Sequence, residues 1–186
     1  MPTSRAARFE AQIAAPRSVV WRVLTDLTRY AAWNPFVLAG RGRLCPDAEV
    51  RVTTRLGAAR VDSVQRVVEW EDERTFAWQD ASAVAPVARS VYTRRLHDLP
   101  DGGTLLAQQV VFRGPLANAS FALLGPALQR GIESESRALK REAEQLAAGP
   151  SARAGVAWSN WAGTVACHVL REVTGIDRHP KIERHV

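Results

Sequence analysis

Residues 8–27, R-F-E-A-Q-I-A-A-P-R-S-V-V-W-R-V-L-T-D-L, decide how the fold begins, because the spacing of their apolar residues changes once. Phe9, Ala11 and Ile13 alternate with mostly polar residues, which predicts a half-buried strand. Pro16 suits the first turn of a helix. The apolar residues that follow recur at helical spacing: Val19, Val20, Val23, Leu24 and Leu27. The sequence therefore predicts a strand followed directly by a helix.

The middle of the chain, from Val37 to Phe112, has a different pattern. Turn residues recur there about every eight to twelve positions between short runs rich in strand formers. The predicted strands are 37–44, 48–56, 59–70, 75–80, 89–97 and 104–113. Since no long helical pattern interrupts these strands, we expect an antiparallel meander.

A long amphipathic helix is predicted after Gly114-Pro115. Its apolar residues lie on or near one stripe: Leu124, Leu128, Ile132, Leu139 and Leu146. Charged residues, Glu135 among them, are assigned to the other, solvated face, and Gly125-Pro126 is expected to kink or break the helix near its start. The fold class is thus α+β, with a seven-stranded antiparallel curved sheet around a long C-terminal helix. Such a sheet encloses more volume than one helix stripe fills, so we expect an internal hydrophobic cavity.

The composition is that of a globular protein. The chain has 186 residues, 46% of them hydrophobic and 24% charged, and only 2 cysteines, which excludes disordered and disulfide-scaffold classes. The net charge of +6 comes from 23 Arg against 2 Lys, a usage typical of G+C-rich bacterial genomes, and no segment is a basic block. We therefore expect no nucleic-acid partner. No apolar stretch is long enough for a membrane span or a signal peptide, which predicts a cytoplasmic protein.

Three stretches carry a family resemblance: F-E-A-Q-I-A-A-P-R-S-V-V-W-R-V-L-T-D at 9–26, Y-A-A-W-N-P-F at 30–36 and G-G-T-L-L-A-Q-Q-V-V-F-R-G at 102–114. On the basis of these three stretches, residues 8 to about 147 resemble members of the START-related (SRPBCC) superfamily, in its polyketide cyclase/dehydrase-like branch. The resemblance implies a helix-grip fold with a deep hydrophobic pocket. It divides the chain into a ligand-binding domain at 1–147 and a C-terminal appendage at 148–186.

The resemblance implies that the domain binds a polyketide-like or lipid-like small molecule. Whether the domain also catalyses cyclisation or dehydration of this molecule is left open. The alternative is a non-catalytic carrier or an accessory protein for a partner enzyme such as an oxidase. The residues expected to line the pocket are Trp33, Phe36, Phe76, Trp78, Tyr92, Arg94, Val110, Phe112, Leu128 and Ile132. For Trp33 and Phe36 a packing role is the alternative, with Asn34 bonding the local backbone ahead of Pro35.

No catalytic motif is recognised, and the catalytic residues stay unknown. A cyclase or dehydratase needs an acid or base inside the cavity. The side chains that qualify by type are Tyr30, Asp80, Tyr92, Arg94 and His97. His97 is expected to be solvated, and an arginine on a strand counts as evidence only if it points inward without a partner. The resemblance implies an acidic residue at position 110, and Val110 there argues against a carboxylate base on that strand.

The C-terminal segment carries a second, short resemblance. Residues 158–173, W-S-N-W-A-G-T-V-A-C-H-V-L-R-E-V, are similar to the opening segment of FAD-linked sugar-lactone oxidases, but the chain has no room for a flavin domain, so no cofactor is expected. Cys167, His168, His179 and His185 match no zinc spacing, so no metal is expected either. We expect Trp158 and Trp161 to pack on the domain or on a second copy, which would make a homo-oligomer.

Overall fold

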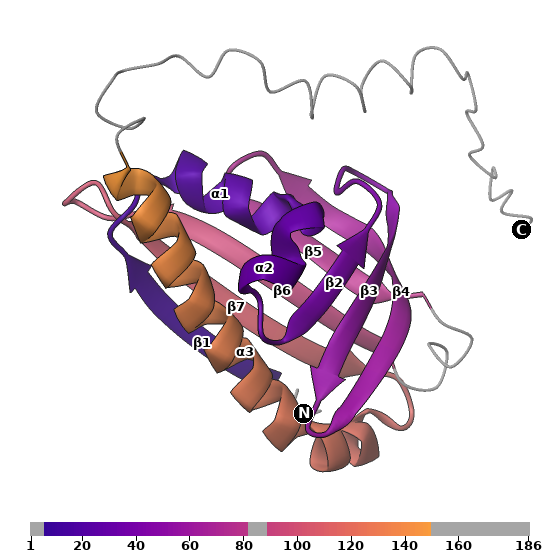
Figure 1. Cartoon of the computed structure of the whole chain (residues 1–186). Coiled ribbons are helices and arrows are strands. Elements are labelled where there is room, and N and C mark those ends of the chain that lie inside the picture. The colour runs from indigo at the N-terminus through magenta and orange to yellow at the C-terminus, as the bar shows by residue number, and fades with distance from the viewer. Residues whose placement is uncertain (1–5, 82–88, 150–186) are drawn as a thin grey trace, which may run out of the picture. The chain divides into compact units, whose positions relative to one another are not determined.

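The computed structural model describes residues 6–81 and 89–149, which form a seven-stranded antiparallel sheet curved around one long helix (Figure 1). The strands are β1 (Ala6–Ile13), β2 (Val37–Arg41), β3 (Glu49–Leu56), β4 (Ala59–Glu71), β5 (Thr75–Asp80), β6 (Arg89–Asp98) and β7 (Thr104–Arg113). The helices are α1 (Arg17–Thr25), η1 (Leu27–Arg29), α2 (Tyr30–Trp33) and α3 (Ala117–Ala148). The predicted fold class is confirmed, with strand ends that differ by at most a few residues.

The strand order is β1-β7-β6-β5-β4-β3-β2, so the first and second strands form the two edges of the sheet. Every neighbouring pair is antiparallel, and β1 pairs with the last strand, β7. The register shifts between Val37 and Ala39 in β2 and between Val67 and Glu69 in β4. Because such irregularities bend a strand and increase its twist, they help the sheet curl toward α3.

Helix α3 begins at Ala117 and continues through Pro126 to Ala148, so of the two expected outcomes, a kink or a break, the break does not occur. Figure 1 shows the first turns of α3 at an angle to the rest, as expected of a proline kink. Ile132 and Leu139 on the inner face are fully buried. A Cβ atom built on Gly131 would lie 2.3 Å from the Phe36 ring, so only glycine lets α3 approach so closely.

The segment before β2 holds itself in place through local hydrogen bonds. The Asn34 side-chain oxygen accepts the backbone N–H groups of Phe36 and Val37, both at 2.9 Å, which confirms the predicted backbone role of Asn34. The Tyr30 hydroxyl donates to the Leu24 carbonyl at 2.6 Å and ties α2 to α1. These contacts fix Phe36 against the start of the sheet.

Within the described residues, no helix is long and apolar enough to cross a membrane. The predicted domain boundary at 147 and the predicted packing of Trp158 and Trp161 stay predictions, since residues 150–186 lie outside the described part.

Candidate functional site

A cavity of about 310 Å³ lies between the concave face of the sheet and the first half of α3. On each contributing strand the lining residues are two positions apart, because alternate side chains of a strand share one face. The strand residues that line it are Val37, Val52, Thr54, Leu56, Val61, Ser63, Gln65, Trp78, Asp80, Ser90, Tyr92, Val110 and Phe112. Phe36, Ser120, Leu124 and Leu128 complete the wall.

The wall of this cavity has an apolar part and a polar part. The polar side chains come mostly from β3 to β6 and from the start of α3: Thr54, Ser63, Gln65, Asp80, Ser90 and Ser120. Gln65 donates to the Ser63 hydroxyl at 2.9 Å and faces Asp80 in the β4–β5 register. The cavity therefore suits a mostly apolar molecule with a few polar groups along one side.

Six of the ten residues that the sequence assigns to the pocket line this cavity: Phe36, Trp78, Tyr92, Val110, Phe112 and Leu128. Phe76, Arg94 and Ile132 are fully buried and do not line it. Trp33 stacks edge-on against Tyr30, with ring centroids 5.0 Å apart, which matches the packing alternative. Phe36 both lines the cavity and packs on α3, so its two expected roles coincide.

Arg94 points into the domain, where three aromatic rings surround its guanidinium. Its central carbon lies 3.6 Å from the ring centroid of Tyr92, 4.3 Å from that of Trp78 and 5.0 Å from that of Phe76. Tyr92 and Arg94 alternate along β6, so both side chains reach the concave face. Arginine over aromatic faces is a favourable contact, and more so without water.

Glu135 supplies the counter-charge and was not found by sequence reasoning, which placed it on the solvated face of α3. Its side chain is fully buried, with one carboxylate oxygen 3.0 Å from Arg94 Nη2 and the other accepting the Tyr92 hydroxyl at 2.9 Å. Glu135 lies three residues after Ile132 and four before Leu139, which is the spacing of one helix face. That spacing is the signal that would have placed it inside.

An arginine on a strand counts as evidence for chemistry only if it points inward without a partner. Arg94 points inward but pairs with Glu135, so it does not meet this condition. Its Nε and Nη1 atoms are nevertheless buried without a hydrogen-bond acceptor in the described residues. The Tyr92 hydroxyl also contacts the side-chain amide of Gln108. The Tyr92 hydroxyl has one hydrogen, which it donates to Glu135, so toward Gln108 it can only accept. The Gln108 side-chain amide can donate to it when its NH₂ group faces Tyr92.

The surroundings fix the protonation states of this group. Burial raises the pKa of Tyr92 well above its usual value, and the adjacent Glu135 carboxylate raises it further. For Arg94, burial alone would lower the pKa, but the charge of Glu135 and the tyrosines outweigh it and raise it. Burial also raises the pKa of Tyr30. At neutral pH the tyrosines are neutral and Arg94 is a cation.

The remaining candidates for chemistry divide into residues inside and outside the cavity. Asp80 lines it. Tyr30 does not line it, and its hydroxyl donates to the Leu24 carbonyl. His97 is exposed at the end of β6, as predicted. The described ranges contain no group of three or more His, Cys, Asp or Glu side chains that could hold a metal ion, and Cys167, His168, His179 and His185 lie outside them.

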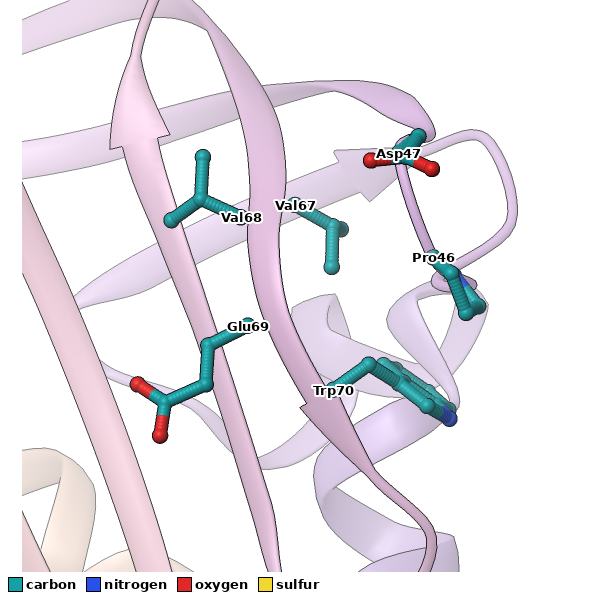
Figure 2. A pocket seen from close by; sticks show the side chains of 6 residues that line it. All are labelled: Pro46, Asp47, Val67, Val68, Glu69 and Trp70. Carbon is teal, nitrogen blue, oxygen red and sulfur yellow. The ribbon is translucent and has the colours of Figure 1, made fainter.

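A second, shallower depression of about 120 Å³ lies at the β4 irregularity and is lined by Pro46, Asp47, Val67, Val68, Glu69 and Trp70. Figure 2 shows Pro46 and Trp70 on one side of β4 and Val68 and Glu69 on the other, so these side chains do not converge. The Trp70 ring nitrogen donates to Asp72 at 2.7 Å, and Glu69 pairs with Arg95 at 3.4 Å. The larger cavity is therefore the candidate site.

Comparisons with known proteins agree with this geometry. Residues 5–144 match the family model described as polyketide cyclase / dehydrase and lipid transport. No curated protein sequence matches the chain.

Solved structures with the same fold include the Zhui aromatase/cyclase from Streptomyces sp. R1128, with a TM-score of 0.65 at 19% identity over 79% of this chain and 97% of that one. A START superfamily protein from Mycobacterium smegmatis has a TM-score of 0.61 at 14% identity over 76% and 98%. A protein from Thermus thermophilus has a TM-score of 0.63 at 18% identity over 78% and 100%. At these identities the likeness shows the fold alone.

Proposed function

Since the chain belongs to the family described as polyketide cyclase / dehydrase and lipid transport, we propose that it binds a hydrophobic, polyketide-like or lipid-like small molecule in the cavity under the sheet. The observation that carries this proposal is the cavity of about 310 Å³ between the concave face and α3. Small-molecule sites typically occupy roughly 300–1,000 Å³ and are mostly apolar with a few placed polar groups.

The distribution of polar groups defines the ligand. Aromatic and branched apolar side chains such as Trp78, Val110 and Leu128 would cover its body. Hydroxyl and amide groups of Ser63 and Gln65 would meet polar substituents on one edge. A fully saturated alkane would leave those polar groups unpaired after displacing water, which costs affinity. The preferred ligand thus carries hydroxyl or carbonyl groups on one side.

Binding without chemistry is the function that the site supports best. A cyclase or dehydratase needs a group that moves a proton at the ligand. The Tyr92 hydroxyl already donates to Glu135, and its raised pKa keeps it neutral. A carrier role, including delivery to a partner enzyme such as an oxidase, requires only the cavity.

Cyclisation or dehydration is the second candidate, and Asp80 is the observation that favours it. This carboxyl group lies on the wall of the same cavity as Tyr92. Turnover of a poly-ketone substrate that Asp80→Asn abolishes, with substrate binding retained, would establish the enzyme. Turnover that survives Asp80→Asn would remove this residue from any mechanism.

A variant that fills the cavity tests the binding proposal. Val110→Trp adds volume to the wall without deleting a polar contact, and we expect it to weaken binding of a fluorescent hydrophobic probe such as 1-anilinonaphthalene-8-sulfonate at least tenfold. Val68→Trp, at an exposed position outside the cavity, is the matched control. Equal binding by wild type and the folded Val110→Trp variant would contradict the proposal.

A further inference from the structure

Four exposed arginines gather on the convex face of the sheet, on the side away from the cavity. On β3 and β4 each of them is the strand neighbour of a cavity-lining residue, either Val52, Thr54 or Val61. Because successive side chains of a strand point to opposite faces, these arginines face away from the cavity and from α3. The arginine on the edge strand β2 lies opposite Arg51 in the register and so shares its face. The four residues define the convex patch: Arg41, Arg51, Arg55 and Arg60.

The convex patch consists of two cross-strand pairs of like charge. Arg41 lies opposite Arg51 between β2 and β3, and Arg55 lies opposite Arg60 between β3 and β4. Directly opposite residues have Cβ atoms roughly 5 Å apart, and the step from Arg51 to Arg55 spans roughly 14 Å along β3. Figure 1 shows β2, β3 and β4 side by side at one edge of the sheet. The two pairs therefore belong to one surface.

The charge of the convex patch is not neutralised within the domain. None of its four side chains forms an ion pair or a side-chain hydrogen bond with the residues that the structure describes, whereas Arg66, further along the same face of β4, pairs with Glu49 at 2.6 Å. Asp62 lies between the two pairs and accepts a hydrogen bond from Thr53 at 2.6 Å. Like charges directly opposite one another destabilise a strand pair. The domain thus contains an unfavourable arrangement that bound anionic groups would relieve.

We propose that the convex patch binds a carboxylate-rich segment of a partner protein. A guanidinium group can bind a carboxylate through two parallel hydrogen bonds, so two guanidinium groups side by side match two neighbouring acidic side chains. The patch and the cavity lie on opposite faces, so a partner bound at the patch leaves the cavity accessible. The proposal goes beyond ligand binding and does not depend on it.

Nucleic acid fits this surface less well than a carboxylate-rich segment. Single strands bind proteins largely by stacking their bases on aromatic side chains. Strands β2, β3 and β4 contain one aromatic residue, Trp70, and its ring packs edge-on against Trp21 with centroids 5.0 Å apart. The convex patch therefore offers guanidinium groups without a stacking surface.

Binding of fluorescein-labelled poly-L-glutamate to the full chain, followed by fluorescence anisotropy, tests the proposal. We expect binding that weakens as salt is added, and weaker binding of a labelled oligothymidylate of equal charge. Arg41→Gln with Arg51→Gln, and separately Arg55→Gln with Arg60→Gln, should each lower the affinity for poly-L-glutamate roughly tenfold, at about threefold for each arginine. Testing the pairs separately means that a folding defect in one variant leaves the other as the test.

The matched control is Arg130→Gln with Arg141→Gln. It changes the net charge by the same amount on α3, where both arginines are exposed and form no ion pair with the described residues, and it should bind poly-L-glutamate like wild type. The melting temperature provides an independent readout. Because each patch pair is unfavourable, both patch variants should melt at or above the wild-type temperature.

Two results would overturn the proposal: no binding of poly-L-glutamate at low salt, or an equal loss of affinity in the α3 control. Tighter binding of the oligothymidylate that depends on the same four arginines would also overturn it and indicate a nucleic-acid partner.

Discussion

The two ends of the concave face differ although the same three strands build both. Toward the start of α3, Trp78, Tyr92 and Val110 border an open cavity. Two positions further along each strand, Phe76, Arg94 and Gln108 are fully or almost fully buried. A two-residue step thus separates a surface that can accept a ligand from one that the protein has already filled.

The filled end contains its own charged partner. Arg94 is held by Glu135 and by three aromatic rings, whereas the cavity end has neutral polar groups and one carboxyl group, Asp80. Tyr92 belongs to both ends, since it lines the cavity and donates to Glu135. The comparison predicts that changes at the filled end alter stability and changes at the cavity end alter ligand binding.

The largest effect on stability is expected from Glu135→Ala. The substitution leaves Arg94 charged and buried without its partner, which typically costs about 3–5 kcal/mol. Chemical denaturation followed by circular dichroism measures the loss. The matched control is Glu133→Ala, which removes a half-exposed i,i+4 pair with Arg137 and a hydrogen bond from Gln129 and should cost only about 1 kcal/mol.

The double variant Arg94→Met with Glu135→Leu sharpens this test. Replacing a buried ion pair by apolar side chains of similar size is often neutral, so we expect most of the stability lost in Glu135→Ala to return. A double variant as unstable as the single one would show that the Arg94–Glu135 contact is not what Glu135→Ala disrupts.

A smaller effect is expected from Gly131→Ala, which acts on the boundary between the two ends. The new methyl group would meet the Phe36 ring at 2.3 Å, so the ring must move, and such overpacking costs about 1–3 kcal/mol. Because Phe36 also lines the cavity, probe affinity should change with it. Gly149→Ala, at the end of α3 with no contact under 3.5 Å, is the control. If the Gly131→Ala variant is destabilised but binds the probe with unchanged affinity, Phe36 does not contribute to ligand binding.

The smallest effect concerns acid stability at the surface. The backbone N–H of Ala14 donates to Glu144 at 2.8 Å, and with Lys140 this lowers the pKa of that carboxyl. A lowered folded pKa gives stability that is present above the unfolded value of about 4.3 and lost as pH falls through the folded value. Glu144→Gln should therefore flatten the acid limb of the stability curve slightly. An identical acid limb in the variant and wild type would contradict this.

The order of strands and helices could be predicted from the sequence because it depends on hydrophobic periodicity and on the positions of turn residues. The strands from β2 to β7 and helix α3 follow from alternation and helical spacing, and the same alternation places Trp78, Tyr92, Val110 and Phe112 on the face that borders the cavity. Their role in ligand binding stays a prediction. Sequence reasoning failed at Glu135, because a charged residue on a long helix usually faces solvent. Its burial depends on Arg94, which lies 41 positions away, and that pairing is visible only after folding.

The comparison also explains why an aromatic residue on the concave face could not be assigned from the sequence to the cavity wall or to the packed core. Phe76 and Trp78 have the same pattern on β5, but only Trp78 lies where the interior is left unfilled. Whether a position on the concave face meets empty space depends on where α3 bends and on which helix side chains reach it. Neither property is encoded in the strand.

The central claim is that a hydrophobic molecule occupies the cavity end and leaves the filled end unchanged. Methyl-resolved NMR with a bound polycyclic hydroxylated aromatic probe tests it directly. We predict large, saturable shifts for the methyl groups of Val52, Val110 and Leu128, and little change for those of Ile13 and Leu139 in the core. Shifts spread equally over both sets, or no saturable shifts at Val52, Val110 and Leu128, would contradict the account.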